Sequence, residues 1–252
     1  MVERASRPPL VTFFAPDPYA VGATVTLGEE AAHHIRVRRL EIGQPVNLVN
    51  GDGGRAAGTL VRVARGHAAV DVVRVETVDA PPAVHLLLPV ADRERMLWLA
   101  EKATELQVAS WRPVLWRRSK SVSPRGEGVT FNAKVRARMA GALEQSGAAW
   151  LPSVFPESSL ERAIAAAPDG DRILLDGEGD AFGARRSGTA ITIAVGPEGG
   201  LESDERELLV AASFALARIG TSTLRFETAA VAAIGVARAL LDGSSTPAPD
   251  SR

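Results

Sequence analysis

Two short segments in the C-terminal third of the chain carry residue types that suit the binding of a small charged molecule. Residues 196–200 read Gly-Pro-Glu-Gly-Gly after an apolar run, and residues 219–225 read Ile-Gly-Thr-Ser-Thr-Leu-Arg after a second one. Glycines let a backbone come close to a ligand, and open α/β sheets bind ligands at the carboxyl ends of their strands. The two segments therefore predict one ligand site, although each alone is also typical of a strand-to-helix turn.

Carboxylates suggest chemistry in two further places. Glu101 and Glu105 stand one helical turn apart and share a face, so they could act together in acid–base chemistry. Surface ion pairs are the more common role of such residues, and we favour that interpretation. The run 172–178 is an apolar strand that ends in a polar turn at Asp176. It could add a third wall to the ligand site.

Positive charge is concentrated in one segment of a nearly neutral protein. The whole chain has a formal net charge of −1, but residues 111–140 hold eight basic residues and one acidic residue, a local charge of +7. Such a patch suits a specific polyanion. A solvated helix face with a basic loop is the equally weighted alternative. The basic residues are Arg112, Arg117, Arg118, Lys120, Arg125, Lys134, Arg136 and Arg138.

Composition excludes several classes of site. The 252 residues contain no cysteine, which rules out disulfides, thiolate metal sites and cysteine nucleophiles. The chain has four histidines, two of them adjacent, so we expect no metal site. No apolar run approaches the roughly 20 residues of a membrane span, and the N-terminus lacks an apolar signal core. We therefore expect a cytoplasmic protein with no membrane segment.

The first part of the chain, residues 1–80, reads as a small β-barrel. Valine-rich or alternating runs predict strands, and Asn-Gly-Asp-Gly-Gly at 50–54 predicts a hairpin. One short helix is expected at 29–37, and Ala-Pro-Pro at 80–82 marks a domain boundary. The expected strands are 10–14, 23–27, 44–50, 55–64 and 68–78.

The second part, residues 83–242, alternates between apolar strands and helical stretches. This alternation predicts an α/β domain whose mainly parallel sheet is covered on both faces. Its first strand lacks a glycine fingerprint, which disfavours a Rossmann-type nucleotide site. Residues 243–252 are expected to form a disordered tail. The expected strands are 84–90, 111–116, 172–176, 190–195 and 214–219, and the expected helices are 93–106, 131–146, 158–167, 204–212 and 227–241.

Several motifs occur together across nearly the whole chain. They are Lys-Ala-Thr-Glu-Leu at 102–106, Arg-Ser at 118–119, Glu-Gln-Ser at 144–146, Gly-Pro-Glu-Gly-Gly at 196–200, Leu-Arg at 224–225 and Glu-Thr-Ala at 227–229. The N-terminal part adds His-His-Ile-Arg-Val-Arg-Arg-Leu at 33–40, Gly-Gln-Pro-Val at 43–46 and Asp-Gly at 52–53. In this combination the chain resembles the bacterial 16S rRNA uridine N3-methyltransferases of the SPOUT superfamily.

The resemblance implies a PUA-like N-terminal β-barrel and a C-terminal SPOUT methyltransferase domain with a deep trefoil knot. It also implies S-adenosylmethionine as cofactor, 16S rRNA in the small ribosomal subunit as substrate, and a homodimer. The implied cofactor-binding residues are Leu175, Asp176, Gly196, Pro197, Glu198, Gly199, Gly200, Ile219, Gly220, Leu224 and Arg225. The implied RNA-binding residues are His34, Arg36, Arg38, Arg39, Arg117, Arg118, Ser119 and Lys120.

For such a reaction, N3 of a uracil must lose its proton as the methyl group arrives. Arg225 is the candidate for holding the uracil oxygens or a phosphate, because a guanidinium suits both. Glu198 or Glu227 could accept the proton, and each could equally be a structural hydrogen-bond acceptor at its loop.

Three alternatives stay open. The first is another SPOUT methyltransferase, acting on tRNA or on a ribose hydroxyl. The second is a non-catalytic RNA-binding assembly protein, because Val90, Ala148 and Ser222 stand where the family commonly has basic residues. The third, a nucleotide-dependent oxidoreductase, is weakened by the missing glycine fingerprint.

Overall fold

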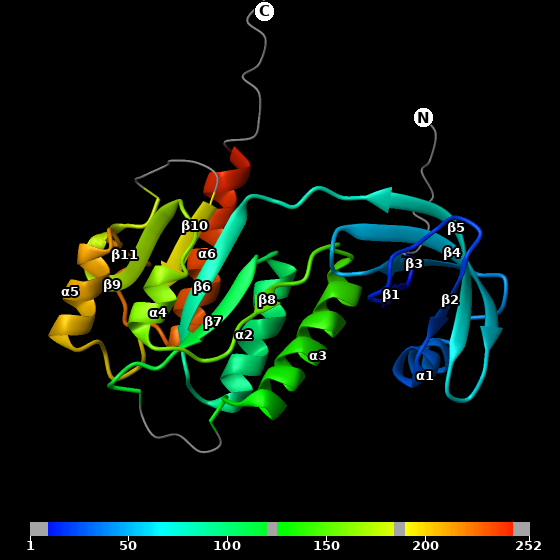
Figure 1. Cartoon of the computed structure of the whole chain (residues 1–252), viewed down its shortest axis with the longest axis horizontal. Helices are drawn as coiled ribbons and strands as arrows, with labels where there is room; N and C mark the ends of the chain where they lie inside the picture. Colours follow the sequence, from blue (N-terminus) through cyan, green and yellow to red (C-terminus); the bar gives the residue numbers. More distant parts are fainter. Residues whose placement is uncertain (1–9, 120–124, 184–189, 244–252) are drawn as a thin grey trace, which may run out of the picture. The chain divides into compact units, whose positions relative to one another are not determined.

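The computed structural model describes residues 10–119, 125–183 and 190–243, which form two compact units (Figure 1). The first unit contains the chain up to Asp79 together with Leu143–Trp150, and the second contains the rest. The sequence analysis assigned residues 143–150 to the second domain, whereas in the structure they cluster with the first unit. Gly243 also belongs to a helix and not to a tail, and the remaining tail residues, 244–252, lie outside the described residues.

The first unit is a curled, five-stranded mixed sheet with one helix. The strand order is β1-β3-β4-β5-β2, in which β1 runs parallel to β3 and the other neighbours are antiparallel. Phe13, Ile35, Leu48 and Leu60 are fully buried in its core. Its elements are β1 (Thr12–Phe14), β2 (Thr24–Leu27), α1 (Glu29–Val37), β3 (Pro45–Val49), β4 (Gly54–Val63) and β5 (Ala68–Thr77).

The predicted hairpin between β3 and β4 is confirmed, and it explains why residues 143–150 join this unit. Gly51 and Gly53 have φ values of +78° and +80°, a region that favours glycine. A Cβ at Gly53 would lie 2.5 Å from the ring of Trp150. The indole Nε1 of Trp150 donates a hydrogen bond of 2.9 Å to the carbonyl oxygen of Val78. The tight glycine turn therefore makes room for a tryptophan that is distant in sequence.

The second unit is a six-stranded parallel sheet with the order β11-β9-β10-β6-β7-β8. This confirms the predicted α/β class. The strands are β6 (Ala83–Pro89), β7 (Ser110–Val114), β8 (Ser153–Val154), β9 (Asp171–Ala181), β10 (Ala190–Ala194) and β11 (Ala215–Arg218). The helices are α2 (Arg93–Glu105), α3 (Val129–Ser146), α4 (Leu160–Ala165), α5 (Ser203–Ala211) and α6 (Phe226–Gly243), and the end of α3, from Leu143 on, belongs to the first unit.

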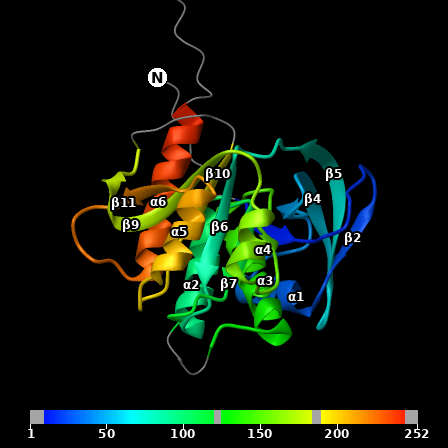
Figure 2. The same ribbon diagram turned by 60° about the vertical axis from the view of Figure 1, so that its left-hand side comes forward.

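Helices cover both faces of this sheet (Figure 2). Side chains alternate between the faces of a strand. Leu86 and Leu88 therefore pack in the cluster formed with α2, α3 and α6, whereas Leu87 packs with α4 and α5. Several small residues of α6 are fully buried and allow α6 to lie close to α2. Ala230, Ala233 and Ala237 belong to this set.

Strand β9 is longer than the sequence predicted, and β8 was not predicted at all. The prediction ended β9 at Asp176 because glycines and acidic residues follow. In the structure, Leu216 of β11 pairs with Leu174, and its neighbour Ala217 pairs with Asp180. Residues 175–179 therefore bulge out of the pairing, which is a common way to place side chains beside a functional site. The trefoil knot implied by the resemblance stays a prediction.

Candidate functional site

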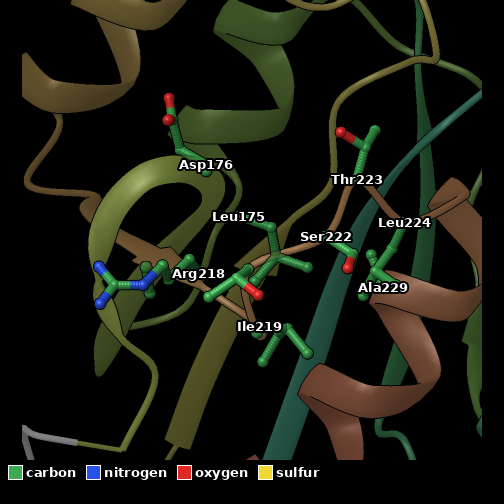
Figure 3. Close-up of a pocket in the computed structure, with 12 residues that line it drawn as sticks. Leu175, Asp176, Arg218, Ile219, Ser222, Thr223, Leu224 and Ala229 are labelled. Carbon is green, nitrogen blue, oxygen red and sulfur yellow. The ribbon is translucent and has the colours of Figure 1, made fainter.

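The β9 bulge forms one wall of two adjoining cavities, with volumes of about 250 and 570 Å³. The loops after β10 and β11 form the other walls, so the three segments singled out in the sequence do meet. Figure 3 shows Leu175 between the β9 bulge and the segment that carries Thr223, Leu224 and Ala229, while the Asp176 carboxylate points away from these three residues. The larger cavity is in the size range of small-molecule sites. One ligand could therefore contact all three segments.

Most of the predicted cofactor-binding residues line these cavities. They are Leu175, Asp176, Gly196, Pro197, Glu198, Gly200, Ile219, Gly220 and Leu224. Gly199 and Arg225 are not among the lining residues. Sequence reasoning missed Gly177, Thr221, Ser222, Thr223, Arg206 and Ala229, which also line the cavities. Most of these residues could have been found from the sequence, because they lie inside or beside the predicted loops. Arg206 is the exception, since it comes from the middle of α5.

Arg206 fixes the carboxylate at the tip of the bulge. Its Nε lies 2.9 Å from Oδ2 of Asp176, and the backbone N–H of Glu178 donates to Oδ1 at 2.8 Å. Burial acts to raise the pKa of Asp176, but the hydrogen bonds from Arg206 and from the Glu178 amide outweigh it and leave this pKa below its ordinary value. A charged, oriented carboxylate is therefore among the residues that line the two cavities.

The loop after β10 is a tight turn that leads into α5. The N–H of Gly200 donates to the carbonyl oxygen of Pro197 at 2.9 Å, and Gly200 has a φ of +75°. Glu202 and Glu205 form a capping box at the start of α5. Gly199 faces away from the cavity, because a Cβ there would lie 2.6 Å from the carbonyl oxygen of Arg118. Its contribution to ligand binding is thus indirect.

Both candidate proton acceptors contact one arginine that the sequence analysis did not single out. Arg95 NH1 lies 3.4 Å from Oε1 of Glu198, and Arg95 Nε lies 3.8 Å from Oε1 of Glu227. Arg95 comes from the first turn of α2, where Asp92 caps the helix and accepts from its backbone N–H. The feature of the sequence that could have indicated Arg95 is its position as a basic residue shortly after β6, which is the parallel neighbour of β10. Only the strand order shows that these positions are adjacent.

Exposure separates the two carboxylates. The Glu198 side chain lines the larger cavity and is 27% exposed. The Glu227 side chain is only 10% exposed, and its Oε2 is enclosed without a hydrogen-bond partner in the part of the chain that the structure describes. A buried carboxylate without donors depends on a nearby cation, and Arg95 is that cation here.

Arg225 is not brought into the cavities. The residue is exposed, and within the described ranges its side chain forms no ion pair or hydrogen bond. Its backbone carbonyl accepts from the N–H of Ala229 in the first turn of α6. Arg225 is therefore free to meet a large partner from solution.

The basic segment is partly neutralised by acidic residues elsewhere. Arg118 contacts Glu202 through two hydrogen bonds of 2.7 and 2.9 Å, and Arg117 pairs with Asp204. Both arginines remain about half exposed. Ser119, by contrast, has a buried hydroxyl without a partner in the described residues. Lys120 lies outside the described residues.

The predicted RNA-binding residues in and just after α1 differ in exposure. His34 is half-buried, packs edge-on against Phe13, and accepts a hydrogen bond of 2.8 Å from Nε of Arg38. Burial, followed by the Arg38 charge, lowers the pKa of His34. Arg36 donates to two carbonyl oxygens of the β4–β5 loop. Arg36 in the last turn of α1 and Arg38 and Arg39 just after it are exposed, so their guanidinium groups are the exposed part of the predicted RNA contact.

The prediction of a surface ion pair on α2 is confirmed. Lys102 Nζ lies 2.8 Å from Oε1 of both Glu101 and Glu105. These hydrogen bonds lower the pKa of Glu101 and raise that of Lys102. In the described residues no group of three or more His, Asp or Glu side chains could hold a metal ion. No described helix is long and apolar enough to span a membrane.

Comparison with known proteins agrees with both units. Residues 79–238 match the model of an RNA methyltransferase domain, and residues 27–73 match an RNA methyltransferase PUA domain. A relative from Bacillus subtilis (strain 168) is 28% identical over 86% of this chain and 91% of its own length. Another, from Mycobacterium bovis, is 31% identical over 93% and 92%. Both are named ribosomal RNA small subunit methyltransferase E.

A solved structure with the same name, from Neisseria gonorrhoeae, has S-adenosyl methionine bound. It superposes with a TM-score of 0.83 at 26% identity and covers 92% of this chain and 98% of its own. The fold, the cavities and the two domain matches define an RNA methyltransferase with an N-terminal PUA domain. More narrowly, the chain belongs to the ribosomal RNA small subunit methyltransferase E family.

Proposed function

We propose that this protein transfers a methyl group from S-adenosylmethionine to N3 of one specific uridine in 16S rRNA of the small ribosomal subunit. The names of the relatives support ribosomal RNA as substrate in preference to tRNA. The observation that carries the proposal is the position of Glu198, a part-exposed carboxylate on the wall of the larger cavity. The uridine N3 position follows from the resemblance stated above.

The cavities suit the proposed cofactor. Leu175, Leu224 and Ala229 offer apolar surface for an adenine ring, and the glycine turns bring backbone polar groups to the cavity walls. Asp176, held as a carboxylate by Arg206, can accept hydrogen bonds from ribose hydroxyls or from an ammonium group. We propose these residues, with the other predicted residues that line the cavities, as the cofactor site.

When bound, S-adenosylmethionine supplies a methyl group attached to a positively charged sulfur, which keeps the bonding electron pair as the methyl group leaves. The protein must orient uracil and remove its N3 proton. We assign proton acceptance to Glu198 because its carboxylate is accessible at the cavity wall. Glu227 is enclosed, so we assign it the role of holding Arg95.

RNA would contact the exposed basic side chains. We propose Arg36, Arg38 and Arg39 on the first unit, and Arg117 and Arg118 on the second, as phosphate contacts. Arg225 is proposed to hold a phosphate beside the target nucleotide, since it is exposed and unpaired within the described residues. Ser119 is a poor candidate because its hydroxyl is buried.

We also propose a cytoplasmic homodimer, in keeping with a ribosomal substrate. Trp98 and Leu224 are large apolar side chains that are 44% and 36% exposed, and a second copy could cover them. Light scattering of the purified protein tests this, and a strictly monomeric mass would contradict it.

The reaction is tested with labelled S-adenosylmethionine and small ribosomal subunits that lack the methyl mark. The product nucleosides are separated and identified by mass spectrometry. We expect labelled 3-methyluridine. A different methylated nucleoside, such as a 2′-O-methyl ribose, would replace the proposed function by another RNA methylation. Cofactor binding without any transfer would favour a non-catalytic RNA-binding protein.

A further inference from the structure

Arg95 is held by two carboxylates but keeps one nitrogen free. Its Nε faces Glu227 and its NH1 faces Glu198, at 3.8 and 3.4 Å. Its NH2 makes no hydrogen bond or ion pair with any described residue. The side chain is 37% exposed, so this nitrogen can be reached by a ligand. The guanidinium is fixed at one end and open at the other.

The edge of uracil that carries N3 presents one N–H between two carbonyl oxygens. A carboxylate beside a guanidinium matches this pattern, since the carboxylate accepts from the N–H and the guanidinium donates to a carbonyl oxygen. Glu198 lines the larger cavity, and Arg95, which is not itself among the lining residues, stands beside it with its NH1 3.4 Å from Oε1 of Glu198. An ordinary surface ion pair would also place them together, but it would not need a second, enclosed carboxylate to hold the arginine.

We propose that Arg95 is a catalytic residue that donates to the carbonyl oxygen next to uracil N3, an inference that rests on the proposed function. As the N3–H bond breaks, its proton goes to Glu198 and its electron pair forms the new N3–CH3 bond. Negative charge spreads onto the flanking carbonyl oxygens during this step. A fixed guanidinium at that place stabilises the charge where it develops.

This role was expected of Arg225, and geometry favours Arg95. Neither arginine is among the residues that line the two cavities, but Arg225 has no described partner that would fix its orientation, whereas Arg95 contacts the cavity residue Glu198. Arg95 is oriented by Glu227, whose enclosed carboxylate has no hydrogen-bond donor among the described residues. A preorganised donor does not have to be ordered during the reaction, which is the source of its advantage.

The test compares Arg95→Gln and Arg95→Lys with the wild-type protein on two substrates. One is small subunits that lack the mark, and the other is the same subunits from cells grown with 5-fluorouracil. Fluorine withdraws electrons and makes N3–H more acidic, so the reaction on the second substrate needs less help from a cation. Arg93→Gln is the matched control, because Arg93 lies on the same helix and stacks over Phe131 at 5.7 Å. Single-turnover methyl transfer, cofactor affinity and thermal unfolding are measured for each variant.

We expect Arg95→Gln to lower the single-turnover rate by roughly 100-fold on normal subunits while cofactor affinity stays near wild type. The loss should be clearly smaller on fluorinated subunits. Arg95→Lys should be intermediate on normal subunits, because lysine keeps the charge and loses the planar fork. Arg93→Gln should resemble the wild type.

Wild-type rates in Arg95→Gln, or the same loss on both substrates, would overturn the inference. The inference would also be overturned if both Arg95 variants lost cofactor binding while their melting temperatures stayed at the wild-type value. If the wild-type protein itself forms a product other than 3-methyluridine, the proposed function fails, and the inference fails with it. The product of the wild-type reaction alone therefore distinguishes a failure of the proposed function from a failure of the Arg95 inference.

Discussion

Gly199 lies directly against the backbone of Arg118, so that a Cβ added at Gly199 would stand 2.6 Å from the Arg118 carbonyl oxygen. The two residues belong to different loops, one at the cavity and one in the basic segment. Arg118 is also joined to the cap of α5 through Glu202. The loop proposed to contact RNA and the loop proposed to bind the cofactor are therefore packed against each other.

We predict that Gly199→Ala lowers both cofactor affinity and small-subunit affinity. The methyl group collides with backbone atoms, which cannot move as a flexible side-chain end can. Calorimetric titration of S-adenosylmethionine and filter binding of subunits measure the two effects. Gly141→Ala in α3 is the control, because a Cβ there meets nothing within 4 Å. It should stabilise the protein by about 0.5–1 kcal/mol. Unchanged cofactor and subunit affinities in Gly199→Ala would show that the contact between Gly199 and Arg118 affects neither binding site.

We predict that Asp176→Asn weakens cofactor binding and removes a pH-dependent part of the stability. The folded protein holds the pKa of Asp176 below its ordinary value. Its contribution to stability is therefore present above the unfolded-state pKa and is lost as the pH falls through the folded-state pKa. Thermal unfolding at several acidic pH values should show wild-type and variant curves that converge toward low pH. A constant difference between them would contradict the prediction.

We predict that binding to small subunits weakens with salt, and that Arg117→Gln with Arg118→Gln reduces this dependence. Each lost phosphate contact lowers the slope of log affinity against log salt by about 1. The pairs with Asp204 and Glu202 compete with phosphates, so the reduction should not exceed about 2. Arg74→Gln, which removes an exposed arginine of β5, tests the specificity of the effect. The same slope in the double variant would exclude this segment as the contact.

We predict that Arg238→Ala destabilises the second unit by on the order of 3 kcal/mol. Arg238 is buried and donates to the carbonyl oxygens of Pro82, Leu106 and Gln107. Its removal leaves three carbonyl groups without this donor: those of Leu106 and Gln107 just after α2, and that of Pro82 just before β6. Urea unfolding measures the change. A loss below about 1 kcal/mol would mean that water replaces the guanidinium.

The sequence by itself predicted the two-part architecture, most elements and the three cavity loops. Local signals sufficed for these features: alternation for the strands, glycine turns at 50–54 and 196–200, and apolar runs that end in polar residues. The α1 helix has the predicted bounds, 29–37. Such signals work because backbone geometry and solvent contact act over a few residues.

Only the tertiary structure decided which residues meet at the candidate site. Arg95 and Glu198 are 103 positions apart and meet because β6 and β10 are parallel neighbours. The β9 bulge depends on its pairing with β11, and the exclusion of Arg225 from the cavities depends on how the start of α6 is placed. Strand order and burial are set by the packing of the whole domain, so periodicity and spacing along the chain carry no record of them.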